Sequence, residues 1–116
     1  MRYICLIYDN EAEYTTMSEA EQQAEMAAYY SFTDAVVKAG IDRGSDALMP
    51  TTMATTVRVR DGKTVTTDGP FAETKEQLGG FYIVECANLD EAIEWAAKIP
   101  GAAHGSVEVR PVMEFN

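Results

Sequence analysis

The sequence predicts an α+β fold in which one antiparallel sheet is covered by two helices. Two observations support this: short strand-like apolar runs of period two, and two polar caps that each open a helical pattern. The predicted order is strand, helix, strand, strand, helix, strand, with a β-hairpin inserted after the second strand. This is the split βαβ pattern of ferredoxin-like folds. At 116 residues, the chain fits one domain, residues 1–116.

The first strand and the first helix are predicted from the first third of the chain. Residues 3–8 are apolar on both alternating faces, which is typical of a strand covered on both sides. After an acidic loop, Ser18 and Glu21 form a capping box that starts a helix, and Gly40 ends it. Apolar residues at steps of three and four predict the face that packs on the sheet. They are Ala20, Ala24, Ala27, Ala28, Phe32, Ala35, Val36 and Ala39.

A second strand and a hairpin follow the first helix. We expect the second strand at residues 42–48, although Gly44 is unfavourable within a strand. Residues 55–60 and 63–66 alternate between polar and apolar positions around Asp61-Gly62. Since Asp-Gly accepts the positive φ angles of a type I′ turn, these two runs predict a β-hairpin.

The last part of the chain predicts a strand, a helix and a final strand. Residues 81–86 form the third main strand, and Asn88 with Glu91 caps the second helix. Pro100-Gly101 ends this helix, and residues 107–112 alternate as the last strand. Both helices would cover one sheet face, while the first strand is apolar on the other face as well. We therefore expect a second copy to cover that face, forming a homodimer.

Composition limits the classes of function. The net charge is −10, with nine Lys and Arg residues scattered along the chain. Nucleic acid and anionic membrane surfaces are therefore not expected as partners. The acids concentrate between Asp9 and Asp34, where seven acids and no base occur; this suits a solvated helix face, or a surface that docks a basic partner.

Cysteine usage and motif content predict a cytoplasmic protein without a cofactor. Cys5 and Cys86 lie far apart within strand-like runs, so neither a CxxC pair nor a zinc site can form, and free thiols are expected. The start of the chain has no signal-peptide pattern. Walker, GxGxxG, HExxH, GxSxG and EF-hand patterns do not occur in the sequence. We expect no bound metal.

The loop at residues 67–80 is the main candidate site, because it concentrates turn residues and carboxylates. Asp68, Glu73 and Glu76 are its candidate catalytic residues. Asp68 precedes Gly69-Pro70 and either closes an Asx-turn or acts as a general base. A single helical turn would place Glu73 and Glu76 on one side, where they either share a proton or simply face solvent.

Four further residues are candidates for binding a substrate. Arg58 lies on the hairpin and offers an anion contact. Glu108 and Arg110 share a strand face opposite Val107 and Val109, so they either pair across a dimer or bind a polar ligand. His104, the sole histidine, lies in a loop and is either exposed or a proton-transfer group.

Several blocks of the sequence together closely resemble the YCII-related family, in its DGPF subgroup. The resemblance covers nearly the whole chain and includes Asp68-Gly69-Pro70-Phe71. The blocks are residues 54–58, 67–76, 78–82, 90–92 and 107–111.

The resemblance implies a ferredoxin-like fold that pairs into a dimeric α+β barrel, in small bacterial cytoplasmic proteins. More distant YCII-like proteins resemble small-molecule enzymes, including a dehalogenating lyase type, with a histidine early in the first helix and an aspartate. This chain has Tyr29 and Tyr30 in that helix but no histidine, so that mechanism is not transferred. The resemblance also implies an association with extracytoplasmic-function sigma factors.

Two functions follow as hypotheses. The first is a small-molecule enzyme that performs acid–base chemistry, of isomerase or lyase type, on a small organic acid. The second is a non-catalytic dimeric module in sigma-factor regulation. Buried loop carboxylates would favour the enzyme, and exposed ones the module.

Overall fold

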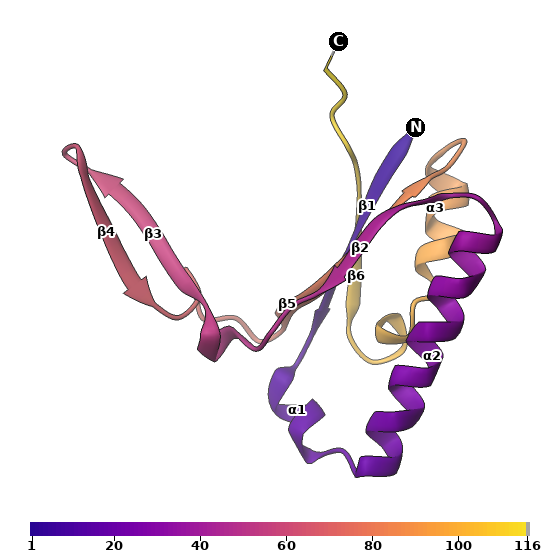
Figure 1. The fold of residues 1–116 in the computed structure, drawn as a ribbon, viewed down its shortest axis with the longest axis horizontal. Helices are drawn as coiled ribbons and strands as arrows, with labels where there is room; N and C mark the ends of the chain where they lie inside the picture. The colour runs from indigo at the N-terminus through magenta and orange to yellow at the C-terminus, as the bar shows by residue number, and fades with distance from the viewer. Residues whose placement is uncertain (116) are drawn as a thin grey trace.

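The fold is a mixed α+β arrangement of two antiparallel sheets and three α-helices, seen in a computed structural model that describes residues 1–115 (Figure 1). The main sheet has the strand order β2-β5-β1-β6, and β3 pairs with β4 in a separate hairpin. The strands are β1 (Arg2–Asp9), β2 (Asp42–Ala47), β3 (Thr55–Arg60), β4 (Lys63–Asp68), β5 (Gln77–Glu85) and β6 (Ser106–Pro111). The helices are α1 (Glu11–Thr16), α2 (Glu19–Lys38) and α3 (Leu89–Ala96), with 3-10 turns η1 (Thr51–Met53) and η2 (Pro100–Ala103).

The strand predictions are confirmed to within a few residues at most ends. The two central strands, β1 and β5, are antiparallel neighbours, with Cys5 opposite Tyr82, and β6 flanks β1 on its other side. β5 begins earlier than expected, at Gln77 rather than at residue 81. This places Gly79 and Gly80 inside the strand. A Cβ on Gly80 would lie 2.8 Å from the carbonyl oxygen of Asp46, so glycine permits the close pairing with β2.

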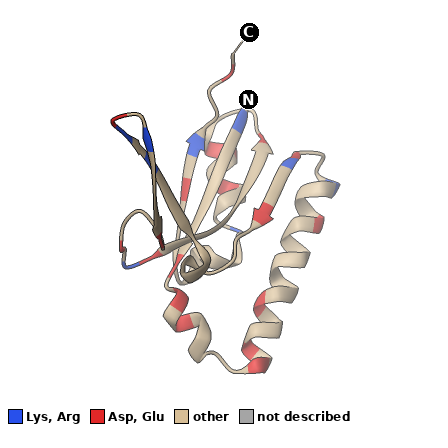
Figure 2. Cartoon of the chain, turned by 60° about the vertical axis from the view of Figure 1, so that its left-hand side comes forward, with Lys and Arg blue, Asp and Glu red and all other residues tan. Residues whose placement is uncertain are grey.

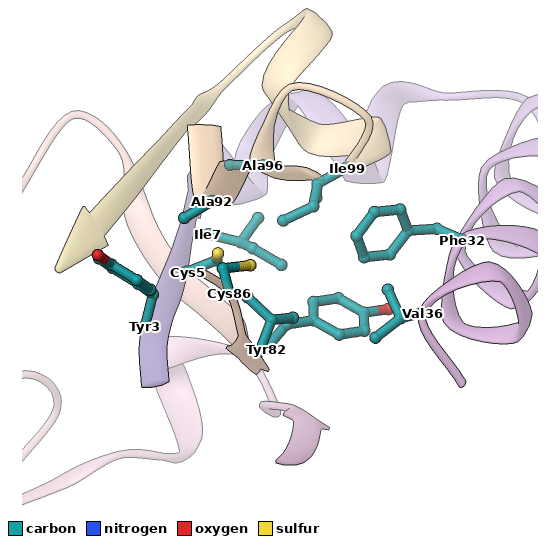
Figure 3. Packing of buried hydrophobic residues seen from close by; sticks show 11 residues of the cluster. Tyr3, Cys5, Ile7, Phe32, Val36, Tyr82, Cys86, Ala92, Ala96 and Ile99 are labelled. Carbon is teal, nitrogen blue, oxygen red and sulfur yellow. The ribbon is translucent and has the colours of Figure 1, made fainter. Parts of the chain in front are cut away.

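The core lies between the sheet and the helices α2 and α3 (Figures 1 and 3). Phe32 of α2 packs edge-on against Tyr82 of β5, with ring centroids 4.9 Å apart. Cys5 and Cys86 are buried and free, as expected, and burial raises the pKa of the Cys5 thiol to about 11. The buried cluster is Tyr3, Cys5, Ile7, Phe32, Val36, Tyr82, Val84, Cys86, Ala92, Ala96 and Ile99.

Helix α2 begins at the predicted cap, but only two residues of its predicted packing face are buried. Ser18 and Glu21 form the reciprocal capping box. Phe32 and Val36 are buried, whereas the alanines of the predicted face are exposed, four of them in the first half of the helix. They are Ala20, Ala24, Ala27, Ala28, Ala35 and Ala39. The first half of the helix continues past the sheet toward α1 (Figure 1). Periodicity alone predicted a face without showing how far the sheet extends beneath it.

Helix α1 was not expected, because residues 11–16 were predicted as an acidic loop. Asn10 caps the helix by accepting a hydrogen bond from the backbone N–H of Ala12. Glu11 joins the helix to η1: its carboxylate accepts hydrogen bonds from the backbone N–H and the hydroxyl of Thr51, at 2.9 and 2.7 Å. These long-range contacts hold α1 beside the end of β2.

The hairpin prediction is confirmed. Asp61 and Gly62 both have positive φ, 52° and 73°, as a type I′ turn requires. The hairpin projects away from the sheet and helices (Figure 1). The side chains of Val57 and Val59 are therefore 60% and 61% exposed.

The sheet face opposite the helices is partly apolar. Ile4 and Leu6 alternate with the buried Tyr3, Cys5 and Ile7, so they point to this open face, and both are half-buried. Opposite them in the register stand Arg110 and Glu108 of β6. In the part of the chain that the structure describes, no helix has the length and apolar character needed to cross a membrane.

Candidate functional site

A cavity of about 680 Å³ lies between α1, α2 and the adjoining ends of β2 and β5. It exists because the first half of α2 leaves the sheet while α1 closes the far side. Much of its wall is apolar and aromatic, which suits a small organic ligand. The aromatic residues are Tyr14, Tyr29, Tyr30, Phe81 and Tyr82, and the acidic ones are Asp9, Glu11, Glu25 and Asp46.

His104 lies between two of the carboxylates that line this cavity. Its Nδ1 is 2.8 Å from Oδ2 of Asp9, and its Nε2 is 2.9 Å from Oε1 of Glu25. The Glu25 side chain is 18% exposed, whereas that of His104 is 42% exposed. Both ring nitrogens thus have carboxylate acceptors, an arrangement that favours the imidazolium.

The pKa of His104 reflects two opposing effects. Burial disfavours the imidazolium and lowers the pKa, whereas the hydrogen bond to Glu25 and the charges of Asp9 and Glu25 raise it. The carboxylates prevail, so the pKa is raised above its usual value. The three groups can therefore hold a shared proton beside the cavity.

Two glycines allow the His104 loop to approach the strand and helix that carry its partners. A Cβ on Gly101 would lie 2.7 Å from the Tyr29 hydroxyl oxygen, and one on Gly105 would lie 2.2 Å from the carbonyl oxygen of Tyr8. Neither distance is tolerable for a real side chain. Glycine at these two positions thus brings η2 and the His104 loop against β1 and α2.

Tyr29 adds a hydroxyl group to the same region. Its oxygen accepts a hydrogen bond from the backbone N–H of Gly101 at 3.1 Å. Burial is the main cause that raises the Tyr29 pKa to about 12, and the nearby charge of Glu25 acts in the same direction. Tyr29 is consequently a protonated hydrogen-bond donor at neutral pH, on the wall of the cavity.

The structure places the loop carboxylates outside the lining of this cavity. Asp68 ends β4 and is exposed, and Glu73 is also exposed. Glu76 is half-buried and accepts a hydrogen bond from the Ser106 hydroxyl at 2.8 Å. Residues 70–76 form an irregular loop without a helical turn, so the helical spacing considered for Glu73 and Glu76 does not occur.

The other predicted site residues lie on two further elements. Arg58 is half-buried on the hairpin. Glu108 and Arg110 share the open sheet face and pair with each other, the Arg110 Nε donating to Glu108 Oε2 at 2.7 Å. Of the predicted residues, only His104 contacts the lining of the cavity.

Sequence reasoning missed Asp9, Glu25 and Tyr29 as site residues. Glu25 was one acid among seven in a segment without bases, and Asp9 followed a strand, so neither stood out. Glu25 lies 79 positions from His104 in the chain. Spacing within a single sequence carries no information about such a contact. Among residues 1–115, no group of three or more His, Cys, Asp or Glu side chains has the arrangement of a metal site.

Comparison with known proteins identifies relatives of the whole chain. The model of the YCII-related domain matches residues 1–116. A protein of Rhizobium meliloti (strain 1021), described as "Uncharacterized protein R00369", is 42% identical over 114 residues, which is 97% of this chain and 92% of that protein.

A solved structure shares the fold. It is the 5-chloro-2-hydroxyhydroquinone dehydrochlorinase (TftG) from Burkholderia phenoliruptrix AC1100, in complex with 2,5-dihydroxybenzoquinone. It aligns with a TM-score of 0.58 at 13% identity, covering 99% of this chain and 96% of the other. At this identity, the match supports the α+β fold alone.

Proposed function

We propose that this chain, which belongs to the YCII-related domain family, is a small-molecule enzyme that moves a proton on a small organic substrate within the cavity. The observation that carries the proposal is His104 held between Asp9 and Glu25 beside an aromatic-walled cavity. The fold relative TftG is named as a dehydrochlorinase and holds a quinone, so a small organic substrate is compatible with this fold.

The geometry supports distinct roles for the residues of this site. The carboxylate of Asp9 or Glu25 accepts a proton from the substrate, while the His104 imidazolium stabilises the carboxylates between which it lies. The Tyr29 hydroxyl donates a hydrogen bond to the substrate oxygen on which negative charge develops. In an isomerisation the proton returns at another atom, and in an elimination a leaving group departs with the electron pair.

The carboxylates of the loop, Asp68, Glu73 and Glu76, remain candidates for the same chemistry, but their position favours the cavity residues over them. Asp68 and Glu73 are exposed, whereas a general base with a shifted pKa needs burial or a close charged partner. The proposal therefore assigns proton transfer to Asp9, Glu25 and His104. Arg58, Glu108 and Arg110 remain candidates for binding an anionic substrate.

We also propose the finer features of the fold that the sequence predicted. The strand order and the two helices on one face support a ferredoxin-like arrangement. The half-buried apolar residues of the open face, such as Ile4 and Leu6, support pairing of two copies into an α+β barrel. Asp68-Gly69-Pro70-Phe71 supports membership of the DGPF subgroup, and the free thiols of Cys5 and Cys86 suit the cytoplasm.

A thermal-shift experiment with 2,5-dihydroxybenzoquinone as the first probe, followed by small carboxylic acids, tests the cavity. Binding should raise the melting temperature of the wild type, since a ligand at a hundredfold its Kd stabilises by about 2.7 kcal/mol. Glu25→Gln and Tyr29→Phe should reduce the shift. The matched variants Glu73→Gln and Asp68→Asn should leave it unchanged.

Turnover is then followed with the compounds that bind. Replacing a proton-transfer group should lower kcat by about 10² to 10⁴, so Glu25→Gln and His104→Gln should lose most activity. Loss of activity in Asp68→Asn or Glu73→Gln, with Glu25→Gln fully active, would move the site back to the loop. If no compound binds, the alternative function is the non-catalytic regulatory module, which exposed loop carboxylates favour.

A further inference from the structure

The β3–β4 hairpin has apolar side chains that the rest of its own chain leaves exposed. It forms a separate two-stranded sheet that projects from the rest of the molecule (Figure 1). Such a hairpin is only marginally stable in water unless its apolar face is covered. Val65 of β4, which stands opposite Arg58 in the register and shares its face, is 46% exposed. Its exposure indicates an apolar contact that the single chain does not supply.

The charge of the hairpin differs from that of the chain as a whole. Its two strands and turn carry Arg58, Arg60 and Lys63 against the acids Asp61 and Asp68, whereas the whole chain has a net charge of −10. Figure 2 shows both basic and acidic residues at the hairpin tip, and acidic residues without basic ones along α1 and at the start of α2. The hairpin and the α1–α2 region are therefore complementary in charge.

The cavity beside α1 and α2 has an acidic lining. Four of its lining residues are carboxylic acids and none is Lys or Arg. Asp46 stands on the edge strand β2 and is exposed. The imidazolium of His104 offsets only part of this charge, so an anionic substrate would be repelled unless a further cation were added from outside. Within one chain, the hairpin projects away from α1 and α2, which line the cavity, rather than over them (Figure 1).

We propose that the β3–β4 hairpin of a second copy of this chain covers the mouth of the cavity and brings its Arg58 against the acidic lining near Asp46. The inference rests on the homodimer of the proposed function. In a twofold dimer each copy gives a hairpin and receives one, so both cavities are closed in the same way. Val65, which lies beside Arg58 on the same hairpin face, is buried against the aromatic wall. Arg58 adds the cation that an organic acid needs.

A charge-exchange experiment tests this contact by native mass spectrometry at low ionic strength. Arg58→Glu and Asp46→Lys should each weaken the homodimer by about tenfold or more, because like charges then face each other at both contacts. In an equal mixture of the two variants, the heterodimer should predominate. It contains one wild-type contact and one contact in which both charges are exchanged. Added salt should reduce this preference.

The matched controls change the same charges elsewhere. Lys75→Glu lies in the exposed loop and Glu94→Lys on α3, and their mixture should form homodimers and heterodimers in statistical proportion. Statistical mixing of Arg58→Glu with Asp46→Lys would overturn the hairpin contact while leaving the dimer in place. A monomeric wild type would overturn both the hairpin contact and the dimer, but the ligand and turnover experiments on the cavity would still stand by themselves.

Discussion

At the scale of single residues, the candidate site depends on one histidine that the sequence leaves without context. His104 follows a 3-10 turn in a loop, and nothing adjacent to it in the chain indicates a partner. The fold brings Asp9 to one ring nitrogen and Glu25 to the other. A residue that sequence reasoning treated as either exposed or functional becomes the centre of a three-group cluster.

The raised pKa of His104 predicts a specific pH dependence of stability. A pKa raised in the folded state contributes stability that is fully present below the unfolded value of 6.5 and is lost as pH rises through the folded value. The free energy of unfolding of the wild type should therefore exceed that of His104→Asn most at acidic pH. Urea unfolding of both proteins between about pH 5.5 and about pH 9 measures this difference. A difference that grows with pH would contradict the prediction.

Gly105 is expected to be intolerant of any side chain. The Cβ of Gly105→Ala would lie 2.2 Å from a backbone oxygen of β1, so the loop must move and His104 with it. The variant should lose about 1–3 kcal/mol of stability, the usual cost of overpacking, and also the elevated pKa of His104. Chemical denaturation and NMR titration of the imidazole check the two effects. Gly79→Ala, whose Cβ would have its nearest neighbour at 4.0 Å, is the matched control and should change stability little.

At the scale of elements, local rules predict where helices and turns begin but not which surfaces they cover. The Ser18 capping box and the Asp61-Gly62 turn involve residues within four positions of one another, and both are confirmed. Helix α1 went unpredicted because six residues carry too short a periodic pattern to distinguish a helix from an acidic loop. The exposed alanines of α2 show the same limit, since apolar residues at helical spacing do not reveal where the sheet beneath the helix ends.

The cap of α2 should make a measurable contribution to stability. In Ser18→Ala the backbone N–H of Glu21 loses its hydroxyl acceptor, at 3.1 Å in the structure. The expected cost is about 1 kcal/mol, or roughly 4 °C in melting temperature. Thermal unfolding followed by circular dichroism measures it. Ser31→Ala, an exposed position in the middle of the same helix, should be neutral or slightly stabilising; equal losses in both variants would rule out the cap as the cause.

At the scale of the whole molecule, one face of the sheet is left without a covering layer by the single chain. Its helix-covered face holds the buried core, whereas the other face presents half-buried apolar residues beside the Glu108–Arg110 pair. Water contact with such a face is unfavourable, and a second sheet packed against it would bury it. In the proposed homodimer, the hairpin and the open face belong to one assembly.

The open face should be sensitive to a single charge. Leu6→Lys places an ammonium group in the centre of the proposed contact between sheets, and its desolvation should shift the protein to a monomer of 12.7 kDa. Light scattering at micromolar concentration reads the mass. Leu89→Lys adds the same charge to an exposed leucine on α3 and should remain dimeric. A dimer that withstands Leu6→Lys would place the interface elsewhere.

The sequence by itself determined the order of the strands and of the two main helices, the caps and the hairpin turn, because these depend on short-range rules of periodicity and backbone conformation. It also carried the resemblance to the YCII-related family. Only the tertiary structure decided that α2 extends past the sheet, that α1 closes a cavity there, and that Asp9 and Glu25 meet His104. These features depend on contacts between residues far apart in the chain, and such contacts are set by how the elements pack, not by the spacing of residues along one sequence.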